Sequence, residues 1–226
     1  MEIFAHRGAA QAARENTVAA FLAARELGAD GVELDVHLSA DGVAVVHHDA
    51  DVPGKGPISD LSVMELPAWL PSLAEALEAC RPLRVNIEIK GDPTSATKRE
   101  DLLVSEVAMA ISVHEEPAGI VVSSFSLTAI DALHSYAPGV ATALLVEPAD
   151  DAMAALERSR EHGHSGLHPF FLSVDEALMR AARTSAIAVR TWTVDDPGRV
   201  VALAELGVDA VITNDVAIAL AALGRF

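Results

Sequence analysis

Two short stretches near the start of the chain combine apolar residues with groups that can bind a metal or move a proton. One is residues 3–8, which end in His-Arg-Gly, and the other is residues 31–36, which contain Glu33 and Asp35. Side chains alternate across a strand, so these two carboxylates point to the same side. They repel each other unless a cation lies between them, and the hard cations Mg²⁺ and Ca²⁺ prefer oxygen ligands. The spacing therefore predicts a divalent-metal site.

Short apolar runs separated by amphipathic segments must position these groups. Strands are predicted near 2–5, 31–36, 43–47, 84–89, 119–123, 140–146, 164–168, 187–192 and 208–213. Helices are predicted near 17–27, 72–80, 96–114, 126–136, 149–161, 173–185, 196–206 and 215–223. The second helix begins with a capping box, in which Ser72 is followed by Glu75 three residues later.

Strands that alternate with helices indicate right-handed βαβ units and a parallel sheet. If 31–36 and 43–47 form one β-arm, the chain has the eight repeats of a (β/α)8 TIM barrel, although the pattern alone also allows an open doubly wound sheet. The candidate residues follow several different strands, which favours the barrel. We expect one domain over 1–226, with a short loop insertion near 50–70. This loop either covers the barrel mouth or only connects two elements.

The chain resembles the glycerophosphodiester phosphodiesterase family over nearly its whole length. The order and spacing of the motifs carry the resemblance, since no single tripeptide is specific. The motifs are His-Arg-Gly at 6–8, Glu15-Asn16-Thr17, Glu33-x-Asp35, Asp41-Gly42, His48-Asp49, Glu88-x-Lys90, Ser124-Phe125 and Trp192-Thr193-Val194.

The resemblance implies a metal site made by Glu33, Asp35 and Glu88. It also implies that His6 and His48 act as an acid–base pair. Imidazole titrates near neutrality, so one histidine can deprotonate a nucleophile while the other protonates an alkoxide leaving group. Attack by the neighbouring glycerol hydroxyl, through a cyclic phosphate, and direct attack by water both remain open.

Two cations and one tryptophan are expected to bind substrate. Arg7 can hold a phosphate through its planar guanidinium group. Lys90 either pairs with Glu88 or binds the substrate phosphate, and the resemblance implies the second role. Trp192 ends a late strand and, by resemblance, lines the pocket for the glycerol or the headgroup.

The remaining histidines receive other predictions. His47 and His48 are adjacent, so only His48 is expected to face the site. His37 shares strand parity with Glu33 and is interpreted as near the substrate or structural. His162 and His164 alternate like a ligand pair, but without evident Cys or carboxylate partners they are predicted to be surface residues.

The chain departs from the family pattern at positions away from the metal set and the histidine pair. Ala50-Asp51-Val52 stands where an Asp-Arg motif is usual, and Asp195 replaces the common asparagine after Trp-Thr-Val. These departures concern the choice of leaving group.

Composition excludes several classes of protein. The formal net charge of −17 disfavours nucleic acids and anionic membranes as partners. The single cysteine, Cys80, permits no intrachain disulfide. The sequence has no evident signal peptide or membrane span, which predicts a cytoplasmic protein. Oligomeric state is not predicted.

The sequence thus predicts a phosphodiesterase that cleaves glycerophosphodiesters to sn-glycerol 3-phosphate and an alcohol with one Mg²⁺ or Ca²⁺. A lysophospholipid or another phosphodiester is the nearest alternative substrate. A metal-dependent sugar-phosphate isomerase or aldolase would share the barrel and carboxylates but would not need His6 and His48 together. A non-catalytic ligand-binding barrel is the third alternative.

Overall fold

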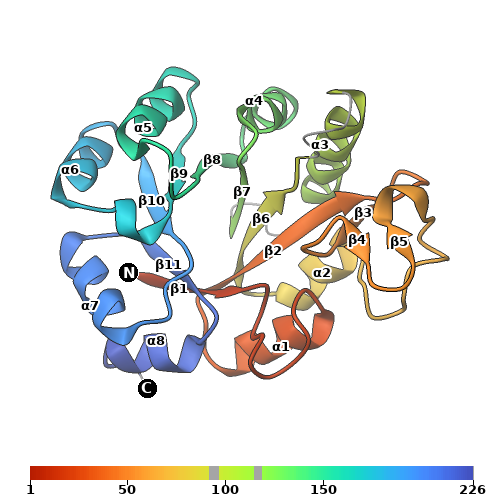
Figure 1. Cartoon of the computed structure of the whole chain (residues 1–226), viewed down its shortest axis with the longest axis horizontal. Helices are drawn as coiled ribbons and strands as arrows, with labels where there is room; N and C mark the ends of the chain where they lie inside the picture. Colours follow the sequence, from red (N-terminus) through yellow and green to blue (C-terminus); the bar gives the residue numbers. More distant parts are fainter. Residues whose placement is uncertain (92–96, 115–118, 226) are drawn as a thin grey trace.

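A computed structural model describes residues 1–91, 97–114 and 119–225, with only the backbone described at residue 97. Eight parallel strands close into a barrel because β1 pairs with β2 on one side and with β11 on the other. Figure 1 shows the helices arranged around these strands. The barrel strands are β1 (Glu2–His6), β2 (Gly31–Leu38), β6 (Arg84–Ile89), β7 (Ile120–Ser124), β8 (Ala141–Val146), β9 (Gly166–Pro169), β10 (Ala188–Thr191) and β11 (Ala210–Thr213). The predicted (β/α)8 TIM barrel is confirmed.

A helix follows each barrel strand, and the predicted helices are present within a few residues of their expected ends. They are α1 (Val18–Glu26), α2 (Leu73–Cys80), α3 (Thr97–Ser112), α4 (Leu127–Tyr136), α5 (Ala152–Glu161), α6 (Glu176–Thr184), α7 (Pro197–Leu206) and α8 (Val216–Ala222). Residue 96, the expected start of α3, lies outside the described residues. The capping box of Ser72 and Glu75 at α2 is present as predicted.

Alternation along the strands divides the barrel into an outer and an inner layer. On β2, for example, Val32, Leu34 and Val36 belong to the large core between the strands and the helices. The residues between them, Glu33 and Asp35, take the opposite face and are also buried. This alternation places carboxylates inside the barrel without removing apolar side chains from the main core.

The segment near 50–70 has more regular structure than predicted. The sequence predicts a loop here, but the segment contains a small antiparallel pair, β4 (Asp51–Val52) and β5 (Gly56–Pro57), followed by the 3-10 turn η1 (Ile58–Asp60). Val52 and Ile58 pack with Val45 of β3 (Ala44–Val46) in a second, smaller core. β3 itself pairs antiparallel with β2, and the whole extension lies at one side of the barrel, in orange in Figure 1.

Among the described residues, no helix is long and apolar enough to cross a membrane.

Candidate active site

The predicted site residues meet at the C-terminal ends of the barrel strands. His6 ends β1, Glu88 lies near the end of β6, and Trp192 follows β10, as expected for a barrel enzyme. All of the predicted site residues except Asp35 line a cavity of about 360 Å³. The full lining is His6, Arg7, Glu33, His48, Asn86, Glu88, Lys90, Phe125, Leu145, Glu147, Trp192, Thr193 and Ile212.

Three carboxylates form a cluster at this cavity, and two of them, Glu33 and Glu88, line it. Each of Glu33, Asp35 and Glu88 offers an oxygen, and these oxygens all lie within 4.8 Å of one another. The pairing of β2 with β6 sets Asp35 directly beside Glu88. All three residues are at most 9% exposed. Such a cluster is unfavourable unless positive charge compensates it.

The pKa values of the carboxylates reflect their burial and their mutual repulsion. Burial, reinforced by the charges of Asp35 and Glu88, raises the pKa of Glu33 well above its usual range. Burial also raises the pKa of Glu88 to about 7. Asp35 differs: burial opposes its ionisation, but the Lys90 ammonium and the hydrogen bond from Asn16 outweigh burial and lower the pKa of Asp35. The protein's cations therefore outweigh burial at Asp35 but not at Glu33 or Glu88.

Lys90 and Arg7 supply those cations. Lys90 Nζ lies 2.8 Å from Asp35 Oδ1 and also pairs with Glu88 Oε1. The salt bridge considered for Lys90 is thus present and extends to a second carboxylate. Arg7 Nε is 3.5 Å from Asp35 Oδ2, and its Nη1 binds Glu15 Oε1 at 3.0 Å.

The turn after β1 directs the backbone of Arg7 toward Glu33. Arg7 and Gly8 have φ values of 58° and 81°, a left-handed conformation that is uncommon for a non-glycine residue. In this conformation the Arg7 N–H donates to Glu33 Oε2 at 3.0 Å. The other oxygen, Oε1, is buried and has no hydrogen-bond partner. This orphaned oxygen and the oxygen-only donor set fit a hard divalent cation.

His6 is held in one tautomer by residues from the end of the chain. Asn214 donates from Nδ2 to Asp195 Oδ2 at 2.7 Å, so its Oδ1 must face His6. His6 Nδ1 therefore donates to Asn214 Oδ1, also at 2.7 Å, and Nε2 is the nitrogen that can accept a proton. Burial lowers the pKa of His6, although the Asn214 hydrogen bond opposes that effect.

His48 lies in the chain just after β3, where two contacts fix it. Its Nδ1 donates to Asp49 Oδ1 at 2.7 Å, and this hydrogen bond lowers the pKa of Asp49. His37 Nε2 donates to the His48 carbonyl oxygen at 3.0 Å. Of the two roles predicted for His37, this hydrogen bond supports the structural one. His47 does not line the main cavity; its ring lies 5.8 Å from that of Trp69.

Aromatic side chains form one wall of the cavity. The Trp192 ring makes edge-to-face contacts with Phe125 and Phe170, at centroid distances of 5.7 and 5.6 Å. Its indole N–H donates to the His168 carbonyl oxygen at 2.8 Å, which fixes the ring. Phe125 and Trp192 line the cavity and offer an apolar surface to the carbon skeleton of a ligand.

Sequence reasoning missed the support that Asp195 and Asn214 give to His6 and the support that Phe170 gives to the Trp192 ring. Asp195 departs from the family pattern, but its carboxylate binds Asn214 through both the backbone N–H and the side-chain amide. The placement of Asn214 after the last strand of a closed barrel was the available signal, since that strand adjoins the one that ends in His6.

Comparison with known proteins gives the family. Residues 6–218 match the model of the glycerophosphoryl diester phosphodiesterase family, nearly the whole chain. The chain belongs to this family. Its named relatives are phosphoric diester hydrolases. A glycerophosphodiester phosphodiesterase of Caldanaerobacter subterraneus subsp. tengcongensis is 32% identical, and the match covers 94% of this chain and 93% of the relative.

Solved structures agree with this membership. A glycerophosphodiester phosphodiesterase from Thermotoga maritima matches with a TM-score of 0.81 and 27% identity over 96% of both chains. An Oleispira antarctica phosphodiesterase, solved with the product sn-glycerol-3-phosphate, matches with a TM-score of 0.89 over 100% of this chain and 97% of that one. At 24% identity, the second comparison supports the fold alone.

Proposed function

We propose that the chain hydrolyses glycerophosphodiesters to sn-glycerol 3-phosphate and an alcohol, and that residues 1–226 act as one catalytic domain. The observation that carries the proposal is that a cluster of three buried carboxylates adjoins a cavity lined by two of them, Glu33 and Glu88, and by His6 and His48. The named activity of the relative that is 32% identical over almost the full length supports the substrate class.

One Mg²⁺ or Ca²⁺ would be held by Glu33, Asp35 and Glu88. When bound, such a cation neutralises the negative charge that develops on the phosphoryl oxygens. The raised pKa values of Glu33 and Glu88 mean that the cation competes with protons for these carboxylates. Binding therefore strengthens as the pH rises.

His6 is assigned as the general base. Its lowered pKa keeps the imidazole neutral near pH 7, and the bond to Asn214 leaves Nε2 as the acceptor. Nε2 would take the proton from the attacking hydroxyl group, whether that of the glycerol or that of water.

His48 is assigned as the general acid. Its Nδ1 donates to the Asp49 carboxylate, which orients the ring and leaves Nε2 free to act on the substrate. When both ring nitrogens carry a proton, Nε2 would protonate the departing alkoxide. Arg7 and Lys90 would bind the phosphate, and Trp192 would pack against the glycerol or the headgroup.

The experiment that tests the proposal measures sn-glycerol 3-phosphate release from glycerophosphocholine, glycerophosphoethanolamine and glycerophosphoglycerol. Reactions contain Mg²⁺, Ca²⁺ or EDTA, with a His48→Ala variant in parallel. We expect metal-dependent release that the variant loses by about 10²–10⁴-fold. A folded, metal-binding protein that releases nothing from these substrates would contradict the proposal, and release from a lysophospholipid instead would reassign the substrate.

A leaving group that needs no protonation separates the two histidines. With a nitrophenyl ester of glycerol 3-phosphate, His48→Ala should hydrolyse the substrate at close to the wild-type rate, because nitrophenolate departs without an acid. His6→Ala should stay impaired on this ester and on the glycerophosphodiesters alike. Equal losses for both variants on both substrates would overturn the acid–base assignment.

A further inference from the structure

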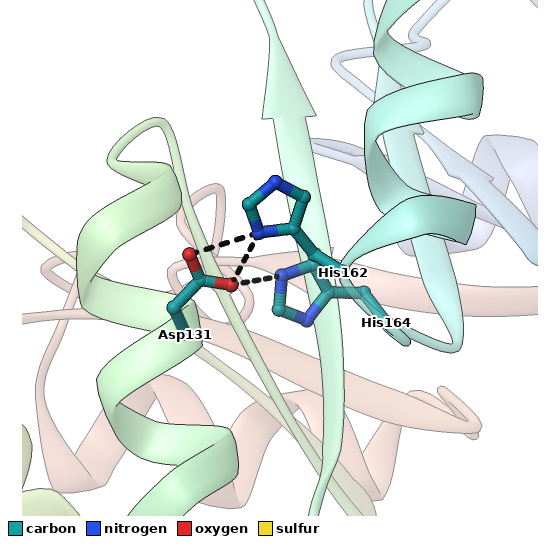
Figure 2. A group of neighbouring side chains, drawn as sticks. All are labelled: Asp131, His162 and His164. Carbon is teal, nitrogen blue, oxygen red and sulfur yellow. Dashed lines mark hydrogen bonds and ion pairs between the residues drawn. The ribbon is translucent and has the colours of Figure 1, made fainter.

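A second group of potential ligands lies away from the catalytic cavity. Asp131 is on α4, His162 ends α5, and His164 lies in the turn that leads to β9. Figure 2 shows the three side chains directed toward one another, Asp131 from α4 and the two histidines from the end of α5 and the turn that follows it. Because residues 162–164 precede β9, they lie at the N-terminal end of that strand, opposite the catalytic mouth. The sequence-based prediction that these two histidines are surface residues is wrong for His164, which is 3% exposed.

The distances among the donor atoms are those of a compact ligand set. His162 Nδ1 lies 3.0 Å from both carboxylate oxygens of Asp131, and His164 Nε2 lies 3.0 Å from Oδ1. One donor atom from each residue lies within 4.8 Å of the others. Two imidazoles thus converge on one carboxylate.

The turn and its surroundings fix this convergence. Gly163 has a φ of 78°, a conformation that glycine adopts readily and that brings the two flanking histidines to the same side. The rings of His162 and His164 lie nearly parallel, with an interplanar angle of 16°. The turn therefore presents both rings to α4.

His164 also has the outer support typical of a metal-binding histidine. Its Nδ1 lies 2.9 Å from the hydroxyl oxygen of Thr142, a buried residue on β8. A hydrogen bond at one ring nitrogen fixes the tautomer and directs the other nitrogen to the metal. The ring of His134, about one turn further along α4, makes an edge-to-face contact with that of His164 at a centroid distance of 6.1 Å.

We propose that Asp131, His162 and His164 form a binding site for a first-row transition-metal cation of the Zn²⁺ type. Two imidazole nitrogens and one carboxylate oxygen are a donor set that Zn²⁺ favours over the all-oxygen set of the catalytic cavity. A bound ion would tie α4 to the turn between α5 and β9, two segments that are 31 residues apart. The site would stabilise the outer layer without entering the reaction.

The test uses Zn²⁺ itself and a protein freed of any histidine tag. In a Glu33→Gln/Glu88→Gln variant, which lacks two catalytic carboxylates, calorimetric titration should show one equivalent of Zn²⁺ bound. Adding His162→Gln should weaken this binding at least tenfold, and adding Asp131→Asn should do the same. His162 is partly exposed, with 40% of its side chain accessible, so its replacement is compatible with folding, which circular dichroism would verify.

A matched control replaces His114 with glutamine. This histidine lies two residues after the end of α3 and outside the trio, so Zn²⁺ binding should be unchanged. In the wild-type chain, Co²⁺ should give the intense visible bands of a four-coordinate site with imidazole and carboxylate ligands. His162→Gln should abolish these bands. Failure to bind Zn²⁺ in the double variant, or equal affinity with and without His162→Gln, would overturn the proposal.

Discussion

His6 depends on a hydrogen bond to a residue 208 positions later in the chain. We predict that Asn214→Ala lowers kcat/KM roughly tenfold, the equivalent of about 1.4 kcal/mol, because the imidazole loses its fixed tautomer. The same hydrogen bond raises the pKa of His6, so its loss lowers that pKa further. The acid limb of the pH–rate profile should therefore move to lower pH. A rate loss with an unmoved limb would mean that Asn214 acts on packing instead.

Glu88 gives a pH dependence that can be measured without substrate. Its pKa is near 4.5 in the unfolded chain and about 7 in the folded, metal-free chain, so folding takes up a proton between these values. This contribution to stability is complete below pH 4.5 and is lost as the pH rises through 7. We predict that Glu88→Gln raises the Tm of the metal-free protein at pH 8 relative to wild type by several degrees, and much less at pH 5.

Metal addition supplies the control for that experiment. Mg²⁺ or Ca²⁺ should raise the Tm of the wild-type protein more at pH 8 than at pH 5, since protons no longer compete for the carboxylates. A Glu88→Gln effect that is the same at both pH values would contradict the role given to this residue.

Strand parity and motifs predicted several residues that the structure brings together. Glu33, Asp35 and Glu88 form one cluster, and His6 and His48 line the same cavity. The local sequence pattern could not predict contacts between residues that lie far apart in the chain. Asp131 and His164 are 33 residues apart, and only the packing of α4 beside the turn before β9 brings them together.

At the scale of elements, the tight turn between β1 and α1 leaves little space for a side chain at Gly8. A Cβ atom on Gly8 would lie 2.7 Å from Ala20 Cβ and 2.8 Å from the Ala20 carbonyl carbon, at a φ of 81°. We predict that Gly8→Ala destabilises the protein by roughly 2–3 kcal/mol and reduces activity, because the turn also places His6. Chemical denaturation and the kinetic assay would measure the two effects.

Gly54 provides a matched control for Gly8. Its φ is 77°, nearly the same, but no atom lies within 4 Å of its added Cβ. Gly54→Ala should therefore cost only the backbone strain, about 1 kcal/mol, and leave activity intact. Equal destabilisation by the two substitutions would show that the contact with α1 is unimportant.

The repeated βα pattern predicted the barrel elements because apolar runs and helix caps are local signals. Side chains cap the described helix starts at Thr17, Ser72, Ser126, Asp151, Asp175, Asp196 and Asp215. The pair β4 and β5 escaped prediction because each strand has two residues, too few for any periodicity to register. The second core that holds this pair depends on contacts with β3.

At the scale of the whole molecule, the net charge of −17 acts on any charged substrate that approaches. Glycerophosphoglycerol carries a net negative charge, whereas glycerophosphocholine is neutral overall. Added salt screens long-range repulsion, with a Debye length of about 8 Å at 0.15 M. We predict that NaCl raises kcat/KM for glycerophosphoglycerol relative to glycerophosphocholine. An unchanged ratio between low and physiological salt would show that surface charge does not govern the encounter.

The barrel closes between its first and last strands, and this has a consequence for synthesis on the ribosome. At about 5–20 residues per second, roughly 10–40 s separate the emergence of His6 from that of Asn214. Until β11 arrives, β1 lacks one neighbour and its outer edge stays open. A nascent or prematurely terminated chain therefore carries all three carboxylates of the cluster but lacks the partner that orients His6. Hydrolytic competence is acquired only when translation of the barrel is nearly complete.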